Sequence, residues 1–344
     1  MAVAENSIRL SAVVPNYNHG RLIGEAIAAL AAQAPPPDEI IVVDDASTDD
    51  SLEILRDLQR QHPTLRVVAL ERNGGAIHAL NRGAREARGE LVYFGAADDV
   101  TMPGLFATGL DIIDRHPEAA FACCEGIVVD TETGHRGYRP PVRPAHGAVF
   151  LAPSDVAQSF RHIDNWMLTG TAIVRRQLML AAGGFDNALG AFADGYLLRK
   201  LAFEHGCCFV PHLGLIWRVS ASGLSRAQAA DPEDGLRTLA IALEQMRADA
   251  VFPGWYPAKF ERRWRFAVCR IAAHASPMNS AVLQQVGARG PIGRFCLGAA
   301  SATGGRIGRF TALVWMSLQE WPTSFVGLLT TSLARRWART SRPA

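Results

Sequence analysis

Apolar and polar residues alternate with two different periods from Ile8 to about Val129. Short runs rich in β-branched residues, typical of buried strands, are separated by stretches with apolar residues at helical spacing. The predicted strands are IRLSAVVPNY (8–17), EIIVVDD (39–45), LRVVALE (65–71) and ELVYFGA (90–96), and the predicted helices are GRLIGEAIAALAAQ (20–33), DDSLEILRDLQRQH (49–62) and GAIHALNRGAREAR (75–88). This alternation predicts an α/β fold with an open, mostly parallel, Rossmann-like sheet flanked by helices.

The regular alternation stops after Val129. The Gly-, Pro- and Arg-rich stretch 130–148 predicts an irregular loop or hairpin, which we expect to lie over the ligand site at the strand ends. The pattern then predicts a helix at 153–162, a strand at 170–176, a helix at 192–206 and a strand at 207–219. We expect a main domain over residues 1–225 and a helical C-terminal extension over residues 226–344, because a single core rarely grows beyond roughly 250 to 300 residues.

The composition is that of a globular protein. Hydrophobic residues make up 49% of the 344 residues and charged residues 20%, with a net charge of +2, so we expect no nucleic acid as a partner. The six cysteines have no CxxC spacing and are interpreted as small buried hydrophobic residues. The first residues, MAVAENSIRL, do not resemble a signal peptide, and we expect a cytoplasmic location.

Polar groups follow three of the predicted strands, namely PNYN (15–18), Asp44-Asp45 and Asp98-Asp99. Ligands of open α/β sheets bind beyond the carboxyl ends of the strands, so we expect these endings to converge. Two adjacent carboxylates repel each other unless a positive group is near, and a divalent cation bridging to substrate phosphates would supply it. Alternatively, Asp98 caps a helix and Asp99 is solvated, and DDASTDDS (44–51) is a turn before a helix.

Five motifs in this order and spacing resemble glycosyltransferase family 2, inverting enzymes of the GT-A fold. They are VVPNYN, IIVVDDASTDDS, NGGAIHALNRGAREARGE, YFGAADDVTMP and GGFDNALGAFADGYLLR. The resemblance covers roughly residues 11–225 and not the helical extension. A dinucleotide-dependent oxidoreductase shares the α/β pattern, but its G-x-G-x-x-G is absent after the first strand, where PNYNHG stands.

The resemblance implies a nucleotide-sugar donor, UDP above all, and a saccharide or lipid-linked acceptor in the synthesis of cell-surface polysaccharide or glycoconjugate. It implies that Pro15 and Tyr17 flank the nucleotide base and that Asp45, with Asp44, hydrogen-bonds uracil or ribose. Asp98 corresponds to the last acid of the Asp-x-Asp motif, which holds Mg²⁺ or Mn²⁺ on the diphosphate.

The same resemblance assigns two further acids. Asp99 lies beside the diphosphate site, and Asp194 matches the catalytic base. A positioned carboxylate that accepts the acceptor's proton contributes on the order of 10² to 10⁴ in rate.

Two positions depart from the family's pattern. Ala96 replaces the first acid of Asp-x-Asp, and Ala193 replaces the Glu that precedes the base. A second hypothesis is therefore a catalytically weakened nucleotide-sugar-binding or scaffold protein of the same fold.

Several other residues have two interpretations. Trp166 is either an aromatic platform for the acceptor or part of the core. Arg218 could reach the diphosphate. Gly74-Gly75 is either a phosphate loop or a turn.

The C-terminal stretch 310–342 combines tryptophans with a basic end. Gln319, Glu320 and Pro322 interrupt the apolar run, so we expect no transmembrane span. One hypothesis is peripheral contact with an anionic membrane, at the inner face, through the aromatic residues Trp315, Trp321 and Trp337 and the basic residues Arg335, Arg336, Arg339 and Arg342. The alternative is a helical subdomain that buries these residues.

Overall fold

The computed structural model describes residues 8–220, 231–275, 277–288, 290–320 and 325–340. The chain divides into two compact units, the first comprising Met1–Gln158 and Asn165–Val219 and the second Ser159–Asp164 and Ser220–Ala344. The domain boundary that we predicted after residue 225 lies outside the described residues.

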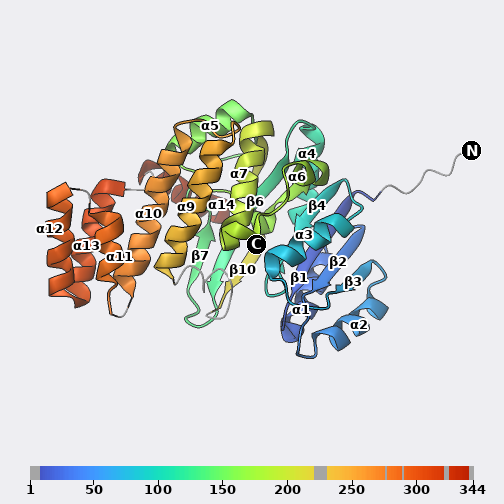
Figure 1. Ribbon diagram of the computed structural model, residues 1–344. Coiled ribbons are helices and arrows are strands. Elements are labelled where there is room, and N and C mark those ends of the chain that lie inside the picture. The colour runs from blue at the N-terminus through green and yellow to red at the C-terminus, as the bar shows by residue number, and fades with distance from the viewer. Residues whose placement is uncertain (1–7, 221–230, 276, 289, 321–324, 341–344) are drawn as a thin grey trace, which may run out of the picture. The chain divides into compact units, whose positions relative to one another are not determined.

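The first unit begins with four parallel strands in the order β3-β2-β1-β4. These are β1 (Leu10–Asn16), β2 (Glu39–Asp44), β3 (Leu65–Ala69) and β4 (Leu91–Phe94), and the helices between them are α1 (Gly20–Ala31), α2 (Ser51–Gln61) and α3 (Ala76–Glu86). Figure 1 shows these helices packed along the strands. All four strands and three helices agree with the sequence prediction, and the predicted α/β architecture is confirmed.

The remaining strands extend the sheet through β9, β6, β10 and β5. The elements of this half are β5 (Val100–Thr101), α4 (Leu105–Arg115), β6 (Phe121–Asp130), β7 (Arg136–Arg139), β8 (Val149–Leu151), α5 (Pro153–His162), η1 (Thr169–Thr171), β9 (Ile173–Arg175), α6 (Arg176–Ala181), η2 (Asn187–Phe192), α7 (Ala193–His205) and β10 (Cys207–Val219). β9 runs antiparallel to both β4 and β6, whereas β10 is parallel to β6. The sheet is therefore more mixed than the sequence suggested.

The hydrophobic core of this unit consists mainly of strand residues of β1, β2 and β4 with apolar side chains from α1 and α4, such as Ile27 and Phe106. Cys124 and Cys208 belong to the same core, in agreement with the interpretation of the cysteines as buried hydrophobic residues. The six cysteines are all free thiols. The stretch 130–148 includes β7, which pairs with β6 as a hairpin.

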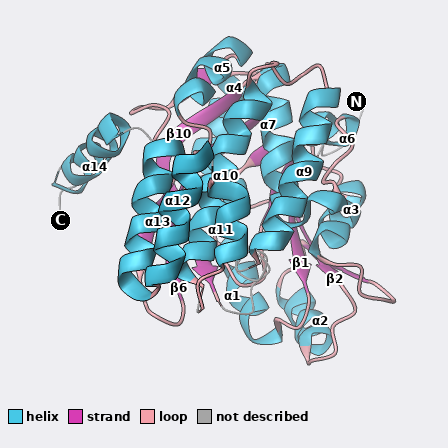
Figure 2. Cartoon of the chain, turned by 60° about the vertical axis from the view of Figure 1, so that its left-hand side comes forward, coloured by secondary structure: helices cyan, strands magenta, loops and turns pink. Residues whose placement is uncertain are grey.

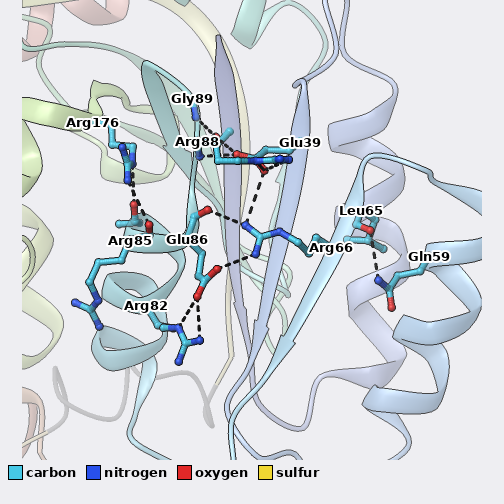
Figure 3. Close-up of polar contacts among 12 residues, drawn as sticks. Glu39, Gln59, Leu65, Arg66, Arg82, Arg85, Glu86, Arg88, Gly89 and Arg176 are labelled. Carbon is cyan, nitrogen blue, oxygen red and sulfur yellow. Dashed lines mark hydrogen bonds and ion pairs between the residues drawn. The ribbon is translucent and has the colours of Figure 1, made fainter. Parts of the chain in front are cut away.

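A charged network closes the amino ends of the parallel strands (Figure 3). Glu39, the first residue of β2, is buried (3% exposed) and accepts hydrogen bonds from the Ser11 hydroxyl (2.7 Å) and the Arg88 backbone N–H (2.7 Å). The Arg88 guanidinium also donates to it, and Arg66 bridges from Glu39 to Glu86. Burial alone would raise the pKa of Glu39, but these hydrogen bonds outweigh it and lower the pKa. The network lies at the opposite end of the strands from the polar motifs, so its role is structural.

The second unit is helical, with α9 (Pro232–Ala248), α10 (Tyr256–His274), α11 (Ser280–Gly287), α12 (Gly290–Thr303), α13 (Gly305–Glu320) and α14 (Phe325–Thr340). Asp164, buried at 1% exposed, accepts a hydrogen bond from the Tyr256 hydroxyl (3.0 Å) and pairs with Arg263 (2.6 Å). Helices α10 to α13 share a core that includes Cys269, Leu283 and Met316.

Part of the predicted aromatic membrane element lies in this core. Trp315 packs against the core of α10–α13, and its indole N–H donates to the Gly287 carbonyl (3.3 Å). Trp321 and Arg342 lie outside the described residues, as do the side chains of Trp337 and Arg339. Among the described helices, none has the length and apolar character that crossing a bilayer requires.

Candidate active site

A buried polar cluster around Asp44 joins the carboxyl ends of β1 and β2. Asp44 is 0% exposed, and its carboxylate accepts hydrogen bonds from the Asn16 amide (2.8 Å) and from the hydroxyl (2.7 Å) and backbone N–H (3.0 Å) of Ser47. This differs from the expectation that Asp44 contacts uracil or ribose, because its oxygens are bound within the protein. Asp44 instead shapes the loop that follows β2.

The loop after β1 is attached to the same segment and leaves Tyr17 exposed. Asn18 has a left-handed backbone (φ 55°), which asparagine tolerates better than most residues, and its side-chain oxygen accepts a hydrogen bond from the Thr48 N–H (2.7 Å). Tyr17, directly before it, is 43% exposed, whereas Pro15 is half-buried in β1. An exposed aromatic ring at the end of a parallel strand is suited to stack on a flat ring of a ligand.

Asp45 fastens the loop between β3 and α3. It is 2% exposed, and its two oxygens accept hydrogen bonds from the backbone N–H groups of Gly74 (2.8 Å) and Gly75 (2.7 Å). Gly75 has φ 87°, a conformation that favours glycine. The glycine pair is therefore a turn held by Asp45, since the N–H groups that a phosphate loop would offer already bind this carboxylate. Each Asp45 oxygen retains a further lone pair for a ligand.

The acid pair follows β4. Asp99 accepts a hydrogen bond from the Arg218 backbone N–H (2.8 Å), while the Asp98 carboxylate has no hydrogen bond or ion pair with any residue that the structure describes. Burial raises the pKa of Asp99 to about 8, with a further contribution from the Asp98 charge, although the N–H and charge of Arg218 oppose the shift. Of the two acids, Asp98 is therefore the more available ligand.

Arg218 of β10 is the positive group that the acid pair requires. Its guanidinium lies 3.4 Å from the Asp98 carbonyl oxygen and donates two hydrogen bonds to Glu25 of α1 (2.7 and 2.8 Å). The pKa of Glu25 is lowered by these bonds, and that of Arg218 is raised. A fixed, permanently charged fork beside two acids is suited to bind a phosphate group.

Asp194 lies in the first turn of α7. Its carboxylate accepts hydrogen bonds from the Thr169 hydroxyl and the Gly195 backbone N–H, and the Arg199 guanidinium is near. Burial raises the pKa of Asp194 more than these three groups lower it. A carboxylate with a raised pKa is a stronger base, so this site can accept a proton from a hydroxyl group.

The short helix η1 connects Asp194 with the end of β4. Thr169 at its start contacts Asp194, and the next residue, Gly170, accepts a hydrogen bond through its carbonyl from the buried Tyr93 hydroxyl (2.9 Å). Tyr93 lies close enough to Asp99 that this carboxylate contributes to the raised pKa of the phenol. Asp194 thus contacts η1 directly, and the acid pair is linked to η1 through Tyr93.

Trp166 belongs to the core. It is 0% exposed and packs edge-on against Phe209, with ring centroids 6.0 Å apart. A buried indole presents no open face to a sugar, so the structure favours the core interpretation over an acceptor platform.

The donor set suits a divalent cation that shares its coordination with a ligand. Among the described residues, no group of three or more His, Cys, Asp or Glu side chains could hold a metal ion. Mg²⁺ commonly uses one or two carboxylates and completes its shell with water and substrate phosphates. Asp98, whose carboxylate is not bound by any residue that the structure describes, fits such a site.

Three contacts of the site were not predicted from the sequence. Asn16 lies inside the predicted strand 8–17, and no sequence motif marks Glu25 or Thr169 as a site residue. Glu25 lies 193 positions from Arg218, and no local pattern marks such a pair. The polar Asn16 inside an apolar strand does indicate a buried hydrogen-bonded contact, because buried polar groups require partners.

Residues 11–179 match the family Glycosyl transferase family 2. A similar relative is an uncharacterized protein from Mycobacterium tuberculosis, 31% identical over 218 residues, which cover 59% of this chain and 65% of that protein. The match therefore spans less than two thirds of that relative's length.

Two solved structures share the fold. S. aureus TarS, in complex with UDP-GlcNAc, has a TM-score of 0.59 at 18% identity, covering 92% of this chain and 93% of that one. A mannosyltransferase from Pyrobaculum calidifontis, in complex with GDP-Man and Mn²⁺, has a TM-score of 0.55 at 21% identity, covering 92% and 88%. Both belong to the same class of mixed α/β structures as this chain.

Proposed function

This chain belongs to glycosyl transferase family 2, and from that premise we propose that it is an inverting glycosyltransferase. The donor is a nucleoside-diphosphate sugar, with UDP as the nucleotide, and the acceptor is a hydroxyl group of a saccharide or a lipid-linked glycan. The product would belong to a cell-surface polysaccharide or glycoconjugate.

One observation carries the proposal, namely two different carboxylate sites that both connect to η1, one through Thr169 and the other through Tyr93. The site linked through Tyr93 contains Asp98 and Asp99 with the Arg218 guanidinium, a set suited to a diphosphate. The site linked through Thr169 contains Asp194, a carboxylate with a raised pKa, suited to accept a proton. Transfer between a phosphate ester and a hydroxyl requires both functions at neighbouring positions.

The nucleoside is assigned to the ends of β1 and β2. Tyr17, exposed beside Pro15, stacks on the base, and Asp45 accepts a hydrogen bond from uracil or ribose with its remaining lone pairs. The loop carrying these residues is held by Asn18 and Asp44. Tyr17 and Asp45 would thus recognise the nucleoside, while Asn18 and Asp44 hold the loop in place.

The diphosphate is assigned to Asp98 and Arg218. Mg²⁺ or Mn²⁺ held by Asp98 would neutralise charge on the diphosphate as it leaves. Arg218, oriented by Glu25, donates hydrogen bonds to a phosphate oxygen and adds a positive charge that does not depend on the cation.

Asp194 accepts the proton of the acceptor hydroxyl while that oxygen attacks the anomeric carbon. The bond from this carbon to the diphosphate oxygen breaks on the opposite face, so the configuration inverts and the nucleoside diphosphate departs with the bonding electrons. Arg199, near the Asp194 carboxylate, opposes the shift caused by burial and keeps the base ionisable.

A catalytically weakened binding protein remains the second candidate, because Ala96 and Ala193 replace two acids of the family's pattern. The enzyme is favoured because Asp194 keeps the contacts that hold its carboxylate, and Asp99 keeps its hydrogen bond from the Arg218 backbone N–H. The Thr169 bond fixes the Asp194 carboxylate and burial raises its pKa, which suits a proton acceptor.

The test is a panel of UDP- and GDP-sugars, assayed for release of the nucleoside diphosphate with and without Mn²⁺, using wild type and Asp194→Asn. We expect turnover of one UDP-sugar that requires the cation and that falls at least a hundredfold in the variant. Binding of UDP-sugars with no turnover above the level of Asp194→Asn would support the binding protein instead.

A further inference from the structure

The helical hairpin α12–α13 carries large apolar side chains on its outer surface. They are Ile292 (68% exposed) and Phe295 (76%) on α12, and Ile307 (71%), Phe310 (70%), Val314 (42%) and Leu318 (76%) on α13. We call these six residues the apolar face. Single exposed apolar residues are common, but a cluster on two neighbouring helices marks an interaction site.

The hairpin is apolar on both sides. The opposite side of each helix packs into the core of the second unit, with Leu297 and Ala300 of α12 and Ala312 and Met316 of α13. The two helices lie side by side in both views (Figures 1 and 2). A Cβ on Gly308 would lie 2.1 Å from the Ala300 carbonyl oxygen, so this glycine permits their close packing. A helix that is apolar on two opposite sides is expected to meet an apolar environment on its second side as well.

The spacing of the apolar face along α13 is that of one helix side. Residues 307, 310, 314 and 318 recur at intervals of three and four, the period of a single stripe. The core residues Ala312 and Met316 form a second stripe with the same period. The outer stripe is thus a continuous surface and not a set of scattered positions.

The charge of the C-terminal sequence indicates what covers the face. After Glu261 the chain contains twelve arginines and one acid, Glu320, whereas the residues up to Glu261 contain 23 of the 35 Lys and Arg and 32 of the 33 acids. Arg294 and Arg306, next in sequence to Phe295 and Ile307, are both exposed. Apolar residues flanked by arginine and almost free of acids match an anionic lipid surface.

We propose that the apolar face of α12–α13 docks onto the surface of an anionic bilayer. The six apolar side chains enter the boundary between headgroups and acyl chains, and Arg294 and Arg306 lie among the lipid phosphates. This surface differs from the tryptophan element predicted from the sequence, because Trp315 lies on the packed side of α13.

Two other occupants fit the charges less well. A second copy of the face would bring together two surfaces that each carry Arg294 and Arg306, which is unfavourable at low salt. A nucleic acid would satisfy the arginines but leave six large apolar side chains in water. An anionic bilayer satisfies both groups at once.

The proposal does not depend on glycosyl transfer, so it is tested by binding alone. The full chain is mixed with vesicles of phosphatidylcholine, or of phosphatidylcholine with phosphatidylglycerol, and floated on a density gradient at low and high salt. We expect flotation only with the anionic vesicles, weaker at high salt. No flotation with anionic vesicles at low salt would overturn the proposal.

Variants separate the apolar and the electrostatic contributions. Phe295→Ser with Phe310→Ser should weaken binding at least about tenfold, because each ring loses its burial in the bilayer, and Leu318→Ser provides a single-residue check. Arg294→Gln with Arg306→Gln should weaken it roughly fivefold for each arginine. The matched control is Arg237→Gln on α9, at a side chain 70% exposed, which should bind as wild type does.

Each variant is checked for thermal unfolding, UDP binding and molar mass in solution. The proposal fails if the serine variants, folded as wild type is, bind vesicles as strongly as wild type. The proposal also fails if the wild type is a dimer that binds no vesicles and the serine variant is a monomer. In that case the apolar face contacts a second copy of the chain.

Discussion

Arg218 and Glu25, 193 positions apart in the chain, are joined by two hydrogen bonds of 2.7 and 2.8 Å. The bonds connect the last strand of the sheet with the first helix. The Glu25 side chain is 53% exposed, so the pair adds little stability of its own. Its effect is to orient the guanidinium beside Asp98 and Asp99.

Changing Arg218 to Gln should weaken UDP binding roughly ten- to hundredfold, because a hydrogen bond to a charged phosphate is lost. Glu25→Gln keeps the arginine and should change UDP affinity by no more than about threefold, since the guanidinium remains charged. Calorimetry with UDP measures both. Equal losses in the two variants would show that the pair acts as a structural unit and not through a phosphate contact.

Asp194→Asn should lower turnover at least a hundredfold without weakening UDP binding, because the amide cannot accept the proton and has nearly the same volume. Turnover and UDP affinity are measured on the same preparation. Turnover near that of wild type would assign the base to another residue.

The same variant should be more stable than wild type at a pH of about 8. The folded-state pKa of Asp194 is raised, so its contribution to stability is complete below the ordinary carboxyl pKa and is lost as pH rises through the raised value. Asparagine does not ionise, and the midpoint of thermal unfolding should therefore exceed that of wild type at this pH but not at a pH of about 4. A lower midpoint at both pH values would mean that the carboxylate is stabilised in its ionised form.

Asp98→Ala should remove the dependence of UDP binding on Mn²⁺, whereas Asp45→Ala should weaken binding with and without the cation. Asp98 would hold the cation through its carboxylate, while Asp45 holds the loop between β3 and α3 through Gly74 and Gly75 and would bind the nucleoside. Titration of UDP with and without Mn²⁺ distinguishes the two. An unchanged response to Mn²⁺ in Asp98→Ala would exclude this residue as the ligand.

Glu39→Gln should lower the free energy of unfolding by about 1 to 3 kcal/mol, because buried donors lose a charged acceptor. The pKa of Glu39 is lowered in the folded protein, so this contribution is present above the ordinary glutamate pKa and is lost as pH falls through the lowered value. Denaturant unfolding of both proteins at neutral and acidic pH should show a difference that shrinks at acidic pH. A constant difference would assign the effect to packing.

The sequence predicted the first half of the fold well because its strands are apolar runs with strong local patterns. The last strand, β10, has the bounds expected for CCFVPHLGLIWRV. The antiparallel β9 was expected as a strand, but its place between β4 and β6 depends on pairing between distant segments. Local periodicity carries no information on such pairing.

The candidate site was predictable where its residues follow strands, and less so where their contacts are distant. Asp44 and Asp45 are adjacent and have the same side-chain chemistry, yet one bonds to Asn16 and Ser47 and the other to two backbone N–H groups. Successive residues along a strand point to opposite faces, and the left-handed Ala46 (φ 60°) that follows the two acids is a conformation that the sequence does not predict. Trp166 likewise packs in the core against Phe209, which lies on a strand distant in sequence, so its burial could not be predicted from local sequence.

The contacts of Asn16, Asn18 and Asp44 with Ser47 and Thr48 order both loops at the ends of β1 and β2. The conformational entropy of these loops is thus lost during folding. A nucleotide that binds at Tyr17 and Asp45 therefore costs the loops little further conformational entropy. Because Asn18 connects the two loops, weakening its contacts would make the nucleotide itself order them. Such a protein would bind nucleotide with a larger unfavourable entropy and a slower association rate, even with every nucleotide contact intact.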